Sequence, residues 1–148
     1  MLEDVRHAIK EYKETYRRQD LPDLELSGLY ALFPDEATTP DVVSRWNDKW
    51  PLCERCGVYF IFGRSGRLLY VGKASMKSSI GYRLSTYFQC DKPTGGCRLL
   101  YTVVTEKPVY VAALAVPADM PFEAAGLEEF LIRRLRPCDN VRGMHAAI

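Results

Sequence analysis

The chain has 148 residues, 47% of them apolar and 26% charged, with a formal net charge of +1, which fits one domain with a flanking segment. No apolar run approaches the roughly 20 residues that a membrane span needs, and residues 1–20 are charged throughout, unlike a secretory signal peptide. We therefore expect a cytoplasmic protein with no membrane partner and, in that compartment, with reduced cysteines.

The first part of the chain predicts helix followed by loops. Apolar residues recur at spacings of three and four over residues 2–18, which predicts a helix. Residues 20–40 are rich in Asp, Pro and Thr, and they predict loops that are interrupted by the apolar stretch 29–33.

A second short helix is indicated at residues 40–46, where Pro40 and Asp41 would open it. We place the boundary of the catalytic core after this segment. Residues 1–52 are then an N-terminal helical and loop flank packed on a core formed by residues 53–148.

The core begins with a predicted β-hairpin. Residues 58–62 and 68–71 are rich in β-branched and aromatic side chains, and a glycine-bearing turn at residues 63–66 separates them. Two such runs around a turn of this kind indicate antiparallel strands.

The rest of the core predicts alternating helix and strand. Apolar spacing indicates a helix at residues 77–89, and strands are expected at 99–104 and 109–116. Pro121 would open a last helix, which Pro137 would end. The expected fold is therefore α+β, with a small antiparallel or mixed sheet flanked by helices.

Short motifs recur across this core in a fixed order. Gly57-Val58-Tyr59 is followed, after ten residues, by Tyr70-Val71-Gly72-Lys73. Arg83 follows on the predicted helix, Glu128 lies on the last helix, and Asn140 comes just after it.

These motifs resemble those of the GIY-YIG nuclease family, with valine in place of isoleucine in both triplets. The likeness covers residues 57–140 and is closest in wording to the N-terminal nuclease domain of the bacterial excision-repair incision subunit. The resemblance implies a GIY-YIG-like fold and a metal-dependent DNA endonuclease that hydrolyses phosphodiester bonds by a one-metal, tyrosine-assisted mechanism.

The chemistry of the motif residues agrees with that function. Magnesium binds hard oxygen ligands and often uses one or two carboxylates plus waters and phosphate, so Glu128 can be the single protein ligand of Mg²⁺ (or Mn²⁺). Glu129 is the fallback ligand. Arg83 offers a charged fork for a phosphate, and Lys73 adds positive potential.

The tyrosines are expected to handle the attacking water. A tyrosine beside a metal ion and two cations can have its pKa lowered from about 10 and serve as a base. The resemblance assigns that role to Tyr59, whereas Tyr70 would orient the water or phosphate and Asn140 would hold a loop or a phosphate. Without the other motifs, both tyrosines would be read as ordinary sheet aromatics.

The charge distribution bears on DNA binding. Residues 1–55 hold 8 Lys/Arg and 12 Asp/Glu, a balance of −4, and residues 56–148 hold 12 and 7, a balance of +5. A basic core is compatible with a polyanion, as it is with ordinary solvated charges. Candidate contacts to the DNA backbone are Lys77, Arg133 and Arg134.

A core of this size has little room to read bases, so a separate protein could supply specificity. The alternative function is a catalytically inactive nucleic-acid- or protein-binding module on the same fold.

The cysteines raise one further possibility. Cys53 and Cys56 have the two-residue spacing of a zinc half-site, and Cys90 and Cys97 form a second pair. A structural Zn²⁺ on these four residues would indicate an interaction domain. The irregular second spacing favours plain reduced cysteines.

Overall fold

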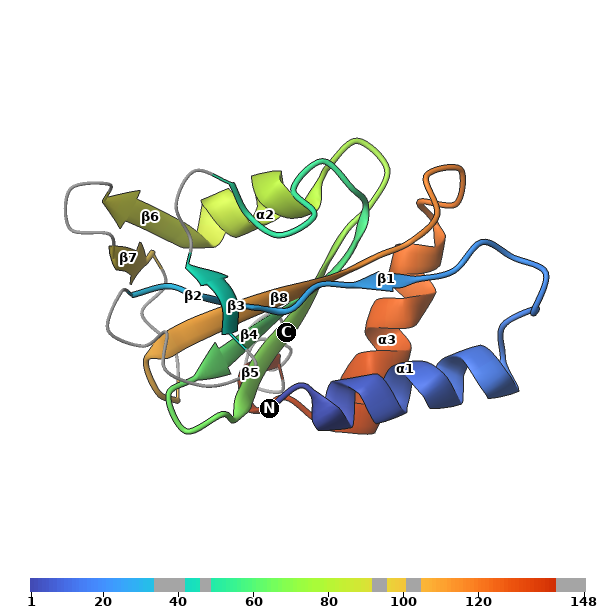
Figure 1. Ribbon diagram of the computed structural model, residues 1–148, viewed down its shortest axis with the longest axis horizontal. Helices are drawn as coiled ribbons and strands as arrows, with labels where there is room; N and C mark the ends of the chain where they lie inside the picture. Colours follow the sequence, from blue (N-terminus) through green and yellow to red (C-terminus); the bar gives the residue numbers. More distant parts are fainter. Residues whose placement is uncertain (34–41, 46–48, 92–95, 101–104, 141–148) are drawn as a thin grey trace, which may run out of the picture.

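The computed structural model describes residues 1–33, 42–45, 49–91, 96–100 and 105–140. The fold is α+β, as the sequence predicts: a mixed sheet with helices on both faces (Figure 1). The strands follow the order β3-β2-β8-β4-β5, and β1 pairs with β8 beside this path. None of the described helices has the length and apolarity needed to cross a membrane.

The predicted hairpin is confirmed and lies at one end of the sheet. Its strands are β4 (Gly57–Gly63) and β5 (Leu68–Ala74), which pair antiparallel. The other side of β4 pairs antiparallel with β8 (Pro108–Ala115), so β4 is central and β5 is the last strand. Every residue of β4 and β8 is buried, which accounts for their nearly continuous apolar sequences.

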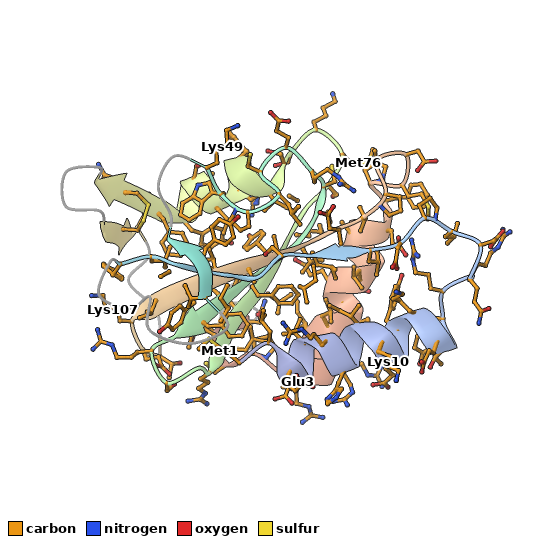
Figure 2. All side chains as sticks on the ribbon, in the orientation of Figure 1. Met1, Glu3, Lys10, Lys49, Met76 and Lys107 are labelled. Atoms are coloured by element: carbon orange, nitrogen blue, oxygen red, sulfur yellow. A yellow bond between two sulfur atoms is a disulfide. The ribbon has the colours of Figure 1, made fainter. Side chains whose placement is uncertain are left out.

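The alternation of side chains along β4 divides the core into two layers. Phe60 and Phe62 face a cluster that includes apolar residues of α1 (Glu3–Thr15) and α3 (Glu123–Leu135). Tyr59 faces the other cluster, which includes residues of α2 (Ile80–Tyr87). Side chains fill the space between the sheet and the helices on both faces (Figure 2).

The N-terminal helix is confirmed and packs against α3, with the labelled Glu3 and Lys10 on its outer side (Figure 2). After α1, β1 (Glu25–Leu26) and β2 (Leu29–Ala31) both pair with β8. The Arg17 guanidinium also donates to the Glu123 carboxylate, with Nε–Oε2 at 2.7 Å and both side chains buried. The flank and the core therefore share a sheet and a buried ion pair, while the boundary at residue 52 stays a prediction.

The second predicted helix is wrong in its described part. Residues Val42–Arg45 form β3, which runs parallel to β2 at the edge of the sheet. Val42 and Val43 are β-branched and favour a pleated surface, and a neighbouring strand overrides the local helix-start signal. Pro40, Asp41 and Trp46 lie outside the described residues.

The helix predicted at residues 77–89 is shorter in the structure. The Ser79 Oγ accepts a hydrogen bond from the Tyr82 N–H at 3.2 Å, a cap that starts α2 at Ile80. The chain then forms a small hairpin of β6 (Phe88–Asp91) and β7 (Gly96–Leu99). Of the strand expected at 99–104, only Leu99 lies in a strand, at the end of β7, and Leu100 does not; residues 101–104 lie outside the described part.

A disulfide joins Cys90 and Cys97 across this small hairpin. The expectation of reduced thiols is therefore wrong for this pair, which the sequence spacing could not distinguish from two free cysteines. Cys53 and Cys56 are free, so the four residues do not form the tetrahedral thiolate site weighed above. Among the described residues, no group of three or more His, Cys, Asp or Glu side chains could hold a metal ion.

Candidate active site

Tyr59 lies at the centre of the candidate site, on the face of β4 that α2 covers. Its side chain is fully buried, and its hydroxyl has no hydrogen bond of normal geometry to a described residue. Gly72 is its partner in the β4–β5 register, and a Cβ on Gly72 would collide with Cζ and the hydroxyl oxygen of Tyr59. The glycine of the second triplet therefore makes room for the tyrosine of the first.

Two more tyrosines surround Tyr59. The ring centroids of Tyr59 and Tyr70 are 6.3 Å apart, and the ring of Tyr87 lies 5.6 Å from each of them. The Tyr87 hydroxyl donates to the Tyr70 hydroxyl at 3.2 Å. Tyr87 is not among the site residues predicted from the sequence. Its position four residues after Arg83, on the same helix face, was the available signal.

Arg83 brings a cation to the tyrosines from α2. Its guanidinium carbon lies 6.0 Å from the centroid of the Tyr87 ring, a distance at which a cation–π interaction is weak. Its Nε is buried and has no hydrogen-bond partner in the described part of the chain. An always-charged donor group is thus held beside the tyrosines without a protein acceptor at that atom.

Glu128 reaches β5 from α3, which packs against that strand. Its side chain is 19% exposed, and its Oε1 lies 3.8 Å from Nζ of Lys73 on β5. Burial raises the pKa of the Glu128 carboxyl, while the nearby Lys73 and Arg83 charges partly offset that effect. Glu129, the fallback ligand, is exposed instead. The half-buried carboxylate is therefore the one that faces the other motif residues.

Asn140 serves the edge of β5. Its side-chain oxygen accepts from the Val71 N–H and its amide nitrogen donates to the Val71 carbonyl, each at 2.8 Å. Asn140 is buried, and it thus takes the place of a further strand beside the residue between Tyr70 and Gly72. Of the two roles expected from sequence, this geometry fits holding a segment and not contacting a phosphate.

The three candidate DNA contacts fall in different places. Lys77 is exposed in the connection between β5 and α2, the two elements that carry Lys73 and Arg83. Arg133 and Arg134 are exposed on α3, and Nε of Arg134 pairs with Oε2 of Glu11 at 2.7 Å. The structure therefore does not bring Arg133 and Arg134 to the tyrosine cluster.

The ionisation of Tyr59 differs from the sequence expectation. Burial raises the pKa of Tyr59 above its usual value, the neighbouring Tyr87 and Tyr70 raise it further, and Arg83 lowers it only in part. The pKa of Tyr70 is also raised, again mainly by burial. Both hydroxyls are thus neutral at neutral pH in the metal-free protein, because the removal of water outweighs the cation.

The residues present fit a magnesium or manganese ion. Glu128 supplies one carboxylate that solvent reaches, and Mg²⁺ is commonly held by one or two carboxylates together with waters and substrate phosphate. In the described part of the chain, the buried hydroxyl of Tyr59 and the Nε of Arg83 have no hydrogen-bond partner. Such atoms in a buried site call for a ligand that satisfies them.

Comparison with known proteins agrees with this arrangement. A family profile described as a UvrC-like GIY-YIG domain matches residues 55–141. The UvrABC system protein C of Wolbachia pipientis subsp. Culex pipiens is 31% identical over 88 residues, and that of Dictyoglomus thermophilum is 33% identical over 91 residues. Each match covers 60% of this chain and 13% of the relative. No solved structure gives a significant match.

The profile match spans every motif that sequence analysis singled out, from Gly57 to Asn140, and it covers more than half of the chain. The fold and the matched motifs lead to the same assignment. The chain belongs to the UvrC-like GIY-YIG domain family.

Proposed function

We propose that this protein is a divalent-metal-dependent endonuclease that hydrolyses phosphodiester bonds in DNA. The observation that carries the proposal is that Arg83 of α2 acts electrostatically on both Tyr59 of β4 and Glu128 of α3, with Lys73 of β5 beside Glu128. Cleavage needs an oriented water and positive charge on the phosphate oxygens. This cluster offers a group for each task.

Glu128 would hold Mg²⁺ or Mn²⁺, which when bound supplies Lewis-acid stabilisation of the phosphate charge. Lys73 prepares the carboxylate for this role, because its charge opposes the rise in pKa that burial causes. The 3.8 Å separation between Nζ of Lys73 and Oε1 of Glu128 is long for an ion pair, so the Glu128 carboxylate would still be able to bind a metal ion.

Arg83 would bind a non-bridging phosphate oxygen. Its Nε has no acceptor among the described residues, and an arginine keeps its charge even where burial disfavours it. The charge of Arg83 also lowers the pKa of Tyr59, against the larger effect of burial.

Tyr59 would position the attacking water through its otherwise unpartnered hydroxyl. In the resting protein this hydroxyl is neutral, so it can donate or accept a hydrogen bond but does not carry the negative charge of a ready base. The base role implied by the family requires bound ligands to lower its pKa. Tyr70 and Tyr87 would fix the ring of Tyr59 through their contacts and their shared hydrogen bond.

The DNA backbone would pass along the side of the domain that carries Lys73 and Lys77. Arg133 and Arg134 remain candidates only for contacts remote from the cut. The chain matches 13% of the length of its curated relatives, so we also propose that a separate protein supplies DNA specificity. A cytoplasmic location is part of the proposal as well.

A nicking assay tests this function directly. Supercoiled plasmid and a branched DNA would be incubated with the protein in Mg²⁺, Mn²⁺ or EDTA, while DNA binding is measured in parallel. We expect nicks only with the metal ions and large losses of rate for Tyr59→Phe and Arg83→Ala. Binding without cutting under every condition, by a folded protein, would instead identify a non-catalytic module.

A further inference from the structure

The exposed side of α3 carries an unusual row of residues. Phe122, Gly126 and Phe130 follow one another at intervals of four, which places them on one face of the helix. Phe122 is 64% exposed, and Gly126 is exposed as well. Phe130 is half-buried, with its ring centroid 5.4 Å from that of Tyr12 on α1, so the row runs from the exposed Phe122 to the border of the core.

One end of the row forms a socket. A groove of about 660 Å³ lies between α1 and α3, which cross near the lower end of α3 in Figure 1. Tyr16, Phe130 and Arg133 line it, and the Tyr16 and Phe130 ring centroids are 5.8 Å apart in an edge-on arrangement. Tyr16 is 68% exposed. The socket is therefore lined by aromatic rings and by charged side chains of both signs.

Gly126 separates the exposed Phe122 from this socket. A Cβ at Gly126 would meet nothing within 4 Å, so no contact within the described protein requires glycine there. Glycine is unfavourable inside a helix, and one of its uses is to let another backbone approach closely. The groove beside Gly126 is open to such an approach.

We propose that this face binds a second copy of the chain, with the two α3 helices antiparallel and crossing at Gly126. Phe122 and Phe130 lie four residues on either side of Gly126, about 6 Å along the axis in each direction. A two-fold axis at Gly126 therefore brings Phe122 of the partner subunit to the socket beside Phe130. By the same symmetry, Phe122 of the first copy enters the equivalent socket of the partner. Rows spaced by four residues are those that interlock in the commonest class of helix packing.

The charges on the face agree with this two-fold arrangement. Arg133 follows Gly126 by seven residues, and the exposed Asp119 precedes it by seven, in the turn before α3. Antiparallel pairing brings the end of α3 that carries Arg133 toward the beginning of the partner helix, which the turn with Asp119 of the partner subunit precedes. A self-complementary patch of this kind is what an isologous interface requires.

A nucleic acid fits this face less well. Glu11 and Glu129 also line the groove, and Arg134 is already paired with Glu11. A phosphate backbone would meet both carboxylates. The interface also leaves the candidate active site open, because residues two apart, such as Gly126 and Glu128, are about 200° apart around an α-helix. The inference does not depend on nuclease activity.

The mass of the chain in solution tests the interface. Sedimentation equilibrium of the full chain over a concentration series should show a shift from 16.9 kDa toward twice that mass. Phe122→Asp should raise the dimer Kd by roughly 30-fold or more, the effect expected of a buried anchor residue. The monomer should keep its stability, because an acidic residue is favourable at a helix N-terminus.

Gly126→Ala gives a sharper test. It should raise the dimer Kd by about tenfold, which is less than the effect of losing a hot-spot residue. It should also raise the melting temperature of the monomer, because alanine is the better helix former. Tyr82→Ala is the matched control, since Tyr82 on α2 is 66% exposed and should not affect association.

Three results would overturn the proposal. The chain could sediment at its monomer mass at every concentration. A dimer could form equally well in Phe122→Asp and Gly126→Ala, which would place the interface elsewhere. Phe122→Asp could also leave the mass unchanged while weakening DNA binding, which would assign this face to nucleic acid.

Discussion

Replacing Asn140 with alanine should destabilise the protein through the edge of β5. The side chain satisfies both the N–H and the carbonyl of Val71, which is fully buried. Each buried backbone group that loses its partner costs about 1–3 kcal/mol, so the pair costs about 2–6 kcal/mol. Water can reach the edge strand once the side chain is gone, which favours the lower part of that range, about 2–3 kcal/mol.

Denaturant unfolding with matched variants would measure this loss. A loss of this size lowers the melting temperature of a chain of this length by about 5–10 °C. Asn140→Asp keeps the acceptor for the Val71 N–H but, when ionised, lacks the donor for the carbonyl. Its deficit relative to the natural protein should shrink as pH falls and the carboxyl gains a proton, whereas that of Asn140→Ala should not. An Asn140→Ala variant as stable as the natural protein would refute this reasoning.

Three further changes probe the site and the flank. Gly72→Ala should displace the Tyr59 hydroxyl by overpacking, costing about 1–3 kcal/mol and reducing nicking with the fold retained, which circular dichroism and the nicking assay would show. In the metal-free protein, the pKa of the Glu128 carboxyl is higher than its value of 4.5 in the unfolded chain. The stability that this shift contributes is therefore present below the unfolded pKa and is lost as pH rises through the folded pKa. Glu128→Gln should therefore be more stable than the natural protein at pH 7 and lose that advantage in acid, as thermal unfolding at several pH values would reveal. Arg17→Ala leaves the buried Glu123 carboxylate unpaired and should cost about 3–5 kcal/mol, whereas replacing both partners with apolar residues should cost much less on denaturant unfolding.

Local sequence signals predicted much of the framework. The hairpin of β4 and β5 followed from two β-rich runs around a glycine turn, and β8 from a long apolar run. The helix α3 followed from apolar spacing between Pro121 and Pro137. Strand β3 was missed because its partner β2 lies outside its own sequence window, so the pairing that decides its structure is not local.

The candidate site takes its residues from motif spacing, whereas its chemistry depends on packing. The motif spacing singled out Tyr59, Arg83 and Glu128, which the structure carries on β4, α2 and α3. The pKa of Tyr59 could not be read from sequence, because it depends on complete burial and on two neighbouring rings. Tyr87 was missed because an aromatic residue on an apolar stripe looks the same whether it packs in a core or borders a site.

The most direct test of the central claim compares two adjacent carboxylates on α3. Nicking rates would be measured over a Mg²⁺ titration for Glu128→Gln and for Glu129→Gln, with melting temperatures confirming that both variants fold. Because only Glu128 faces Lys73 and the tyrosine cluster, we expect Glu128→Gln to lose metal-dependent cutting while Glu129→Gln keeps it. Full activity in Glu128→Gln, or equal losses in both variants, would contradict the account.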